Sequence, residues 1–224
     1  MKISQETLVL LKNFSSINPG IFIHEGNKIR TVSQSKTIFA QAELEDSFEQ
    51  DFGIYDLNNF LSVLTLSGKE LPELEFDTHH VIVKSLGGRS KIKYRLTDKQ
   101  MIVTPPDKDI VINNPDIKFT LTSQDYDWIT KSGNVLQSPN LAIIGEDGVL
   151  KLSTFDSSND SAHLNSIDIG EAESDFKFVF KTENLKMLAG EYDVTVDPGR
   201  LAQFSSTVLK LDYYVAIEKE GSEW

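Results

Sequence analysis

The chain of 224 residues is 39% hydrophobic and 25% charged, which is typical of a globular protein with one large core or two cores of about 100 residues each. Its 34 acidic and 22 basic residues give a net charge of -12, which argues against an open DNA-binding surface, because such a surface gains affinity by neutralising phosphates. The sequence has no cysteine, which excludes disulfides and thiolate catalysis, and no apolar run near the roughly 20 residues of a membrane-spanning helix, so we expect a cytoplasmic protein without membrane contact.

The first predicted helix begins with SQETLVLLKNF, residues 4–14. Ser4 is expected to cap it, and Glu6 in the first turn places a carboxylate near the positive end of the helix. The apolar residues recur at helical spacing on one face, and Lys12 falls almost opposite the centre of that face. We therefore expect Lys12 to point away from the core.

The rest of the first half alternates between strand and helix signals. Residues 20–45 alternate apolar and polar side chains between turn signals, which predicts an antiparallel meander. A second helix is predicted at residues 57–66, capped by Asp56, with an uncharged exposed face. The stretches PELEFD, VIVKSL, KIKYRLT and KQMIVTP then predict further short strands.

A linker is predicted where prolines, asparagines and aspartates gather at residues 104–116 around a short apolar run. This composition predicts an N-terminal domain at residues 1–106, an interdomain linker at 107–116 and a C-terminal domain at 117–224.

The two halves resemble each other. SQETLVLLK at residues 4–12 aligns without a gap on SQDYDWITK at 123–131, and YDLNNF at 55–60 is echoed more weakly by FKTENL at 180–185. A match this short can arise by coincidence, but the matching order of helices and strands favours a duplicated unit. We therefore predict an α+β fold of two similar domains, each with two helices packed on antiparallel β-sheet, and place Lys186 in the fourth helix.

Catalytic and metal-binding patterns are weak. His79 and His80 are adjacent in a predicted strand and point to opposite faces, while His24 and His163 stand alone. There is neither a phosphate-binding loop nor a nucleophile elbow. The sequence thus predicts a protein that is not an enzyme and that uses no metal or cofactor.

Four stretches carry a family resemblance. KNFSSINPGI, IYDLNNFLSVLTL, NLKMLAGEY and DYYVAIE, in this order, resemble the DNA polymerase sliding clamps of T-even-type bacteriophages. The resemblance runs from Lys2 to about Glu218 and weakens at residues 70–107 and 155–175. It implies the DNA clamp fold and a ring of three subunits that encloses double-stranded DNA and tethers the phage polymerase. It also implies an ATP-driven clamp loader, a role with the late-transcription machinery, and a location in the cytoplasm of the infected bacterial host.

The resemblance also implies DNA-facing lysines. A closed ring retains DNA by topology and needs little attraction per phosphate, which suits an acidic chain. Expected non-specific phosphate contacts are Lys12 and Lys131, then Lys2 and Lys186, then Lys181. Without the resemblance, a lone lysine on the polar face of a helix is usually just solvated.

Family clamps bind the C-terminal tail of their polymerase in an apolar pocket near the interdomain connection, which makes Ile110, Val111 and Ile112 candidates, together with Tyr213 and Tyr214. Core packing is the alternative for these five residues. Subunits are expected to join head to tail through edge strands that the sequence does not identify. The alternative to a clamp is a non-enzymatic, β-rich structural or adaptor protein of a phage.

Overall fold

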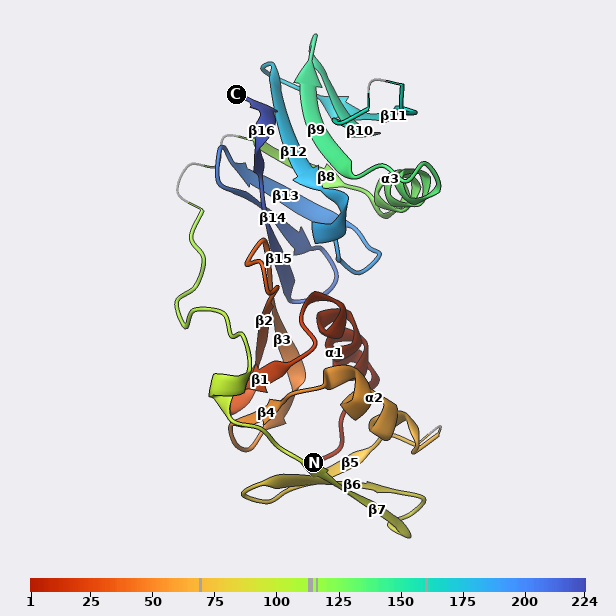
Figure 1. Ribbon diagram of the computed structural model, residues 1–224, viewed down its shortest axis with the longest axis vertical. Coiled ribbons are helices and arrows are strands. Elements are labelled where there is room, and N and C mark those ends of the chain that lie inside the picture. The colour runs from red at the N-terminus through yellow and green to blue at the C-terminus, as the bar shows by residue number, and fades with distance from the viewer. Residues whose placement is uncertain (69, 113–114, 116, 160) are drawn as a thin grey trace. The chain divides into compact units, whose positions relative to one another are not determined.

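The computed structural model describes residues 1–68, 70–112, 115, 117–159 and 161–224, and the chain divides into two compact units, Met1–Lys108 and Asp109–Trp224 (Figure 1). The division falls inside the expected linker of residues 107–116, whose own bounds stay a prediction. Asn113, Asn114 and Asp116 of that linker lie outside the described residues, and residues 104–112 form neither helix nor strand.

The first unit places two helices beside short antiparallel sheets. Strand β1 pairs with β4, β2 pairs with β3, and β5, β6 and β7 form a three-stranded sheet in that order. Its elements are α1 (Gln5–Ile17), β1 (Ile21–Ile23), β2 (Gly26–Val32), β3 (Ile38–Phe48), β4 (Phe52–Ile54), α2 (Leu57–Thr65), β5 (Glu73–Phe76), β6 (His80–Ser85), β7 (Ser90–Arg95) and the 3-10 turn η1 (Lys99–Met101).

The second unit contains the helix α3 beside two sets of antiparallel strands. One is a five-stranded sheet in the order β11-β10-β9-β12-β16, and in the other β15, β14, β13 and β8 pair in succession. Its elements are β8 (Ile117–Leu121), α3 (Ser123–Val135), β9 (Asn140–Glu146), β10 (Val149–Phe155), β11 (Asn165–Glu171), β12 (Phe176–Lys181), the 3-10 turn η2 (Thr182–Asn184), β13 (Tyr192–Asp197), β14 (Leu201–Ser206), β15 (Leu211–Ala216) and β16 (Glu218–Glu223).

The start of α1 is held by a double cap. The Ser4 hydroxyl accepts a hydrogen bond from the backbone N–H of Thr7 at 3.2 Å, as expected of an N-cap. The Asp46 carboxylate on β3 then accepts bonds from the Ser4 N–H and the Thr7 hydroxyl, each at 2.7 Å. Burial alone would raise the pKa of Asp46, but these hydrogen bonds lower it below its usual range. Asp46 therefore ties the first turn of α1 to the sheet.

The exposed face of α2 is uncharged, as the sequence predicted. Asp56 accepts a hydrogen bond from the Asn59 N–H at 2.9 Å and so caps the helix. The core side consists of Leu57, Phe60 and Leu64. The exposed side consists of Asn58, Asn59, Ser62 and Thr65.

The sequence repeat is visible in the burial of α1 and α3. An offset of 119 residues superposes the buried positions Thr7, Leu10 and Phe14 of α1 on Tyr126, Ile129 and Gly133 of α3. The N-caps differ from this offset by one residue, because Thr122 and not Ser123 caps α3. The ungapped alignment therefore describes which side of each helix is buried, although the two helices do not begin at matching residues.

The prediction of a fourth helix near Lys186 is wrong. After the turn η2 the chain is irregular, and tyrosine side chains bond its backbone: Tyr126 donates to the Met187 carbonyl at 3.1 Å, and the Leu188 N–H donates to the Tyr213 hydroxyl at 3.2 Å. Burial raises the pKa of Tyr126 to about 12, so its hydroxyl remains a donor at neutral pH. Tertiary hydrogen bonds thus replace those a helix would make.

One strand prediction is wrong, and one strand was missed. Residues 99–105 begin with η1 instead of a strand, because the N–H groups of Met101 and Ile102 bond back three residues to Asp98 and Lys99. Strand β14, with Ala202 and Phe204 buried, was not anticipated.

Replacing Asp46 by Ala is expected to destabilise the first unit. The change leaves the fully buried Thr7 hydroxyl without its acceptor, which costs about 1–3 kcal/mol. Because the folded pKa is lowered, this stabilisation is complete above the unfolded pKa of about 3.9 and is lost as pH falls through the folded pKa. Urea unfolding at pH 7 and near pH 3 measures both effects, with the exposed Glu45→Ala as control. Equal stability of the two variants at pH 7 would contradict the double cap.

Candidate functional site

The outward rows of α1 and α3 carry the two lysines that the sequence singled out. On α1 the exposed residues follow one another as Gln5, Val9, Lys12 and Ser16, and on α3 the same offset of 119 gives the exposed residues Gln124, Trp128, Lys131 and Val135. Both lysines therefore point to solvent from matching positions. Each row presents one cation preceded by an apolar side chain.

Lys131 has an acidic neighbour that sequence reasoning missed. Its ammonium lies 2.8 Å from the Asp127 carboxylate, one helical turn away. Exposed ion pairs of this spacing contribute only about 0.3–0.5 kcal/mol, so a phosphate can displace the carboxylate. The four-residue spacing of Asp and Lys in SQDYDWITK was a signal for this pair. No carboxylate partner for the Lys12 ammonium is found in the part of the chain that the structure describes.

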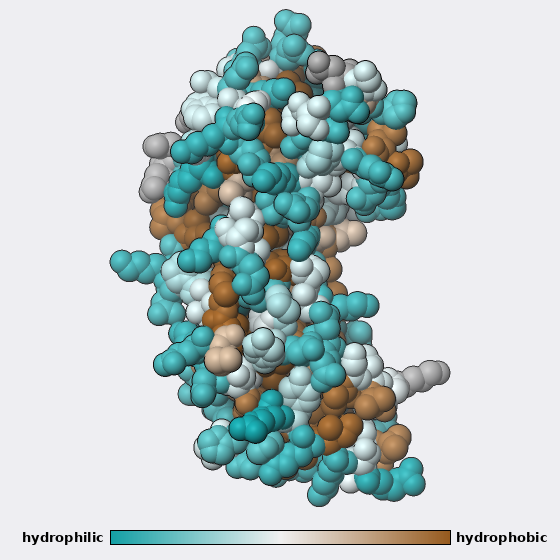
Figure 2. Space-filling model, viewed as in Figure 1, coloured by the Kyte–Doolittle hydropathy of each residue, from teal (hydrophilic) through white to brown (hydrophobic). Residues whose placement is uncertain are grey.

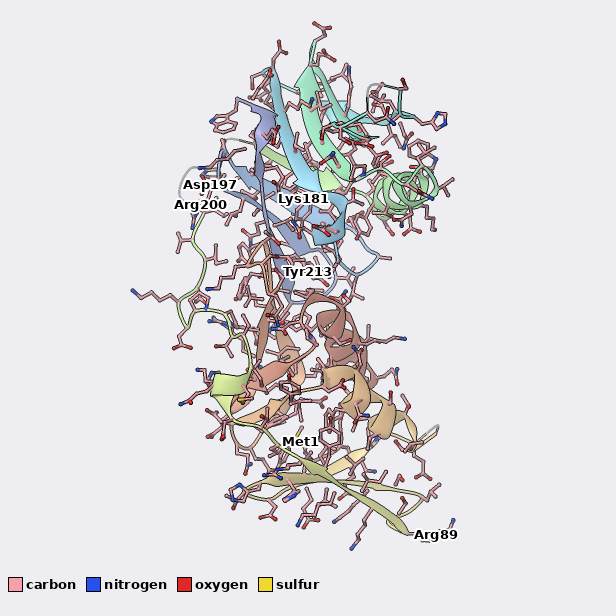
Figure 3. The ribbon with its side chains drawn as sticks, viewed as in Figure 1. Met1, Arg89, Lys181, Asp197, Arg200 and Tyr213 are labelled. Atoms are coloured by element: carbon pink, nitrogen blue, oxygen red, sulfur yellow. The ribbon has the colours of Figure 1, made fainter. Side chains whose placement is uncertain are left out.

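The other three predicted lysines are exposed but lie outside the α-helices. Lys2 precedes α1 and its backbone forms a bridge to Glu73 of β5. Lys181 is the last residue of β12 (Figure 3), and Lys186 lies in the irregular segment after η2. Only Lys12 and Lys131 therefore share a common setting.

The first unit contains a pocket beside the start of the linker. It has a volume of about 340 Å³ and is lined from β1, β2, η1 and residues 104–107 by Phe22, His24, Glu25, Lys28, Arg30, Lys99, Thr104, Pro105, Pro106 and Asp107. The Lys99 ammonium lies 5.3 Å from the centroid of the Phe22 ring, and Arg30 donates to the Asp107 carbonyl at 2.9 Å. The pocket thus combines apolar walls with three basic side chains.

The carboxylate of Asp51, next to this pocket, is stabilised in its ionised form by neighbouring groups. A hydrogen bond from the Glu25 N–H at 2.7 Å, together with His24 whose Nδ1 lies 3.0 Å from the carboxylate, lowers the pKa of Asp51. Asp51 therefore stays ionised at neutral pH, and its charge is compensated locally.

None of the five predicted pocket residues lines this pocket. Tyr213 is fully buried, with its ring 6.1 Å from that of Tyr192, and Tyr214 is buried with its hydroxyl 3.3 Å from the Gln203 amide nitrogen. The expectation of an exposed pocket is therefore wrong for both tyrosines, which pack in the second unit. The residues that do line the pocket come from separate stretches of sequence, and no local pattern connects them.

The linker residues remain candidates for partner binding. The Val111 side chain is 61% exposed, and Ile110 and Ile112 are half-buried. The Val111 carbonyl accepts a hydrogen bond from Arg200 at 2.8 Å, and Arg200 also pairs at 2.9 Å with the buried Asp197 (Figure 3). The chain at Val111 is thus anchored by its backbone while its side chain faces solvent.

Two edge strands have matching patterns. Strand β7 ends the three-stranded sheet with Ile92 and Tyr94 half-buried, and its exposed residues are Lys91, Lys93 and Arg95. Strand β11 ends the five-stranded sheet with Ile167 and Ile169 half-buried, and its exposed residues include Asp168 and Glu171. The two edges therefore carry opposite charges beside half-covered apolar side chains.

Within the described residues, no group of three or more His, Asp or Glu side chains is placed to hold a metal ion. In the same part of the chain, no helix is long and apolar enough to cross a membrane.

Comparisons with known proteins cover nearly the whole chain. The DNA polymerase processivity factor family matches residues 4–104, and the gp45 sliding clamp C-terminal family matches residues 118–219. The sliding clamp of Vibrio phage KVP40 is 34% identical over 97% of this chain and 99% of its own length. The sliding clamps of Escherichia phage RB69 and Enterobacteria phage T4 are 29% and 28% identical, each over 99% of both chains.

Solved structures show the same fold at low identity. The PCNA of Thermococcus kodakaraensis has a TM-score of 0.71 at 15% identity over 96% of both chains. The A. fulgidus PCNA, solved with the C-terminal region of FEN-1, has a TM-score of 0.72 at 13% identity over 96% of this chain and 95% of its own. The helices on antiparallel sheets in two similar units are therefore those of a DNA clamp fold. The chain belongs to the family of bacteriophage sliding clamps, the DNA polymerase processivity factors.

Proposed function

We propose that this protein acts as a ring of three copies that encircles duplex DNA and holds the phage replicative polymerase on it. The observation that carries the proposal is the pair of matching outward rows on α1 and α3, each with one lysine in a chain of net charge -12. Family membership supports the ring and the tether. We extend the proposal to loading by an ATP-driven clamp loader, a part in late transcription, a location in the host cytoplasm and the absence of catalysis.

Weak attraction is what a sliding ring requires. Each strong phosphate contact would have to break at every step along the duplex, whereas topology retains the ring at no such cost. Salt screens the electrostatic potential of acidic groups on other surfaces over about 8 Å at physiological ionic strength. A few lysines can therefore determine the local potential near the DNA. We assign this role to Lys12 and Lys131, with Lys2, Lys181 and Lys186 as further phosphate contacts.

Replacing both Lys12 and Lys131 by Glu is expected to lower the salt concentration at which the protein stops stimulating its polymerase. Six phosphate contacts in a ring of three would turn into repulsions. The measurement is primer extension on a circular template with loader and ATP at rising salt, with the double variant of the exposed Lys36→Glu and Lys219→Glu as a charge-matched control. If both variants respond alike, the two helices do not face DNA.

The template shape separates a clamp from the alternative of a structural or adaptor protein. A ring slides off the ends of a linear template, so stimulation should disappear when the circle is cut. An adaptor that binds polymerase or DNA directly would stimulate both templates equally.

We place polymerase binding at the pocket between Phe22 and Pro106, and we keep Ile110, Val111 and Ile112 as separate candidates for contact with the polymerase. Apolar walls suit the apolar side chains of a peptide tail, and Lys28, Arg30 and Lys99 suit its carboxylates. The hydrogen bond from Arg30 to the Asp107 carbonyl holds this side of the pocket in place, so the pocket is formed before the peptide binds.

Replacing Lys28 by Glu is expected to weaken binding of a peptide from the polymerase C-terminus about tenfold, because it puts a like charge at the pocket rim. Fluorescence anisotropy of the labelled peptide measures the affinity. The exposed Lys36→Glu in the turn between β2 and β3 makes the same charge change on the same unit and should have no effect. An unchanged affinity in the Lys28 variant would place the tail elsewhere.

We further propose that β7 of one copy pairs with β11 of the next. A head-to-tail ring needs two different surfaces on each copy that complement each other, and these open edges do so in charge and in apolar content. Strand β16 is a less suitable partner, because its half-buried residues are Glu218 and Ser222.

Charge exchange tests this pairing. Lys93→Glu and Asp168→Lys are each expected to shift the protein from trimer to smaller species, and the double variant should recover the trimer because the opposite charges meet again. Analytical ultracentrifugation at micromolar concentration measures the species. A double variant that assembles no better than either single one would disprove the pairing.

A further inference from the structure

Three buried tyrosines surround an irregular segment of the second unit. They come from three different elements, Tyr126 from α3, Tyr192 from β13 and Tyr213 from β15. Their rings pack edge to face, with centroids 5.8 Å apart for Tyr126 and Tyr192 and 6.1 Å apart for Tyr192 and Tyr213. We name these three side chains the tyrosine bracket.

The hydroxyls of the tyrosine bracket bind the backbone of two consecutive residues. Tyr126 donates to the Met187 carbonyl at 3.1 Å, and Tyr192 donates to the Leu188 carbonyl at 2.5 Å. The Leu188 N–H donates to the Tyr213 hydroxyl at 3.2 Å. Burial raises the pKa of all three hydroxyls, so they stay protonated at neutral pH. Of the four backbone N–H and C=O groups of these two residues, three are therefore paired with the bracket.

Lys186 directly precedes the two bound residues. Its side chain is exposed, whereas that of Met187 is buried. Residues 185–190 form neither helix nor strand, so no regular ladder of backbone hydrogen bonds holds them. The tyrosine bracket therefore supplies the hydrogen bonds that fix the backbone next to this lysine.

Exposure alone indicates no function for Lys186. Figure 2 shows hydrophilic side chains over much of the visible face of the protein, and a lysine on such a surface is usually just solvated. The backbone beside Lys186, however, is bound by Tyr126 of α3, the helix that also carries Lys131. The bracket thus ties Lys186 to an element to which we already assign a DNA contact.

We propose that the tyrosine bracket positions Lys186 for contact with the phosphates of the enclosed DNA. The inference rests on the proposed encirclement of duplex DNA, with Lys186 as one of its contacts, and adds the groups that place this lysine. In the first unit, β4 is followed by α2, whose exposed face is uncharged. In the second unit, β12 is followed by η2 and by the segment that the bracket holds. The cation is therefore present where the regular helix is absent.

A fixed backbone matters for a contact that is made and broken at every step along the duplex. A lysine on a mobile segment must order its backbone as well as its side chain each time it meets a phosphate, and this loss of entropy recurs with every contact. A segment held by buried hydrogen bonds has already lost that freedom on folding. The bracket therefore strengthens a weak contact without adding positive charge to the chain.

Removal of one hydroxyl tests the inference. Tyr213→Phe keeps the ring in the core but removes the acceptor of the Leu188 N–H. Hydrogen exchange of residues 185–190 is expected to become faster. The salt concentration at which stimulation of the polymerase on a circular template is halved should fall, by at least half of the shift that Lys186→Ala causes, because a poorly placed lysine contributes less.

The decisive variant combines the two changes. In the Lys186→Ala background, Tyr213→Phe is expected to cause no further shift in salt dependence, since no lysine is left to position. A general loss of stability would instead appear in both backgrounds, and thermal unfolding measures it. Tyr192→Phe, which removes the donor to the Leu188 carbonyl, serves for the same cycle if Tyr213→Phe does not fold.

Tyr214→Phe is the matched control. It removes a buried hydroxyl from the same strand, but this hydroxyl lies 3.3 Å from the Gln203 amide nitrogen and not beside residues 185–190. The control should change neither the hydrogen exchange of that segment nor the salt dependence of stimulation.

The outcomes separate this inference from the proposed function. If Tyr213→Phe causes the same shift with and without Lys186, the bracket is only structural and the inference is wrong. If Lys186→Ala has no effect while the double variant of Lys12→Glu and Lys131→Glu does, Lys186 does not reach DNA, and the inference is wrong although the proposed clamp stands. If stimulation persists equally on a linear template, the proposed function fails and the inference fails with it.

Discussion

The open edges of the sheets are the constraint on which the proposed assembly of this protein depends. A strand at the end of a sheet presents backbone N–H and C=O groups without partners, and proteins usually cover or blunt such edges. Here β7 carries Lys91, Lys93 and Arg95 along its edge and the register of β11 with β10 shifts between Asp168 and Gly170, yet both strands keep half-buried apolar side chains. Their charges are opposite in sign, which makes each a better partner for the other than for itself. In the proposed ring, charge thus favours a head-to-tail contact over a symmetric one.

In the proposed ring, the acidic composition is compatible with DNA because closure of the ring, and not charge attraction, retains the duplex. A protein that binds DNA from one side needs many phosphate contacts, and its affinity falls steeply with salt. A closed ring needs only that the channel not repel the duplex. The single lysines of α1 and α3, one of them held by Asp127, and the uncharged face of α2 are consistent with that requirement. In such a ring, the strength of the subunit contact would decide how long the protein stays on DNA.

Features set by neighbours in sequence were predictable, and features set by distant contacts were not. Helical spacing and capping placed Lys12 and Lys131 outward and identified Ser4 and Asp56 as caps, because these depend on residues within one or two turns. The prediction of a fourth helix was wrong because the hydroxyls of Tyr126 and Tyr213, 61 and 25 residues away, form hydrogen bonds with the backbone of Met187 and Leu188. The pocket beside the linker could not be predicted for the same reason, since its walls come from segments that are brought together only by folding.

The duplication explains why one helix has an apolar side left uncovered. In the first unit α1 packs beside α2, whereas in the second unit the segment corresponding to α2 is the turn η2 and an irregular stretch bonded by tyrosines. That stretch holds only one flank of α3. The other flank carries tryptophan at the position where α1 has valine, and an exposed indole beside an open strand is unfavourable in water.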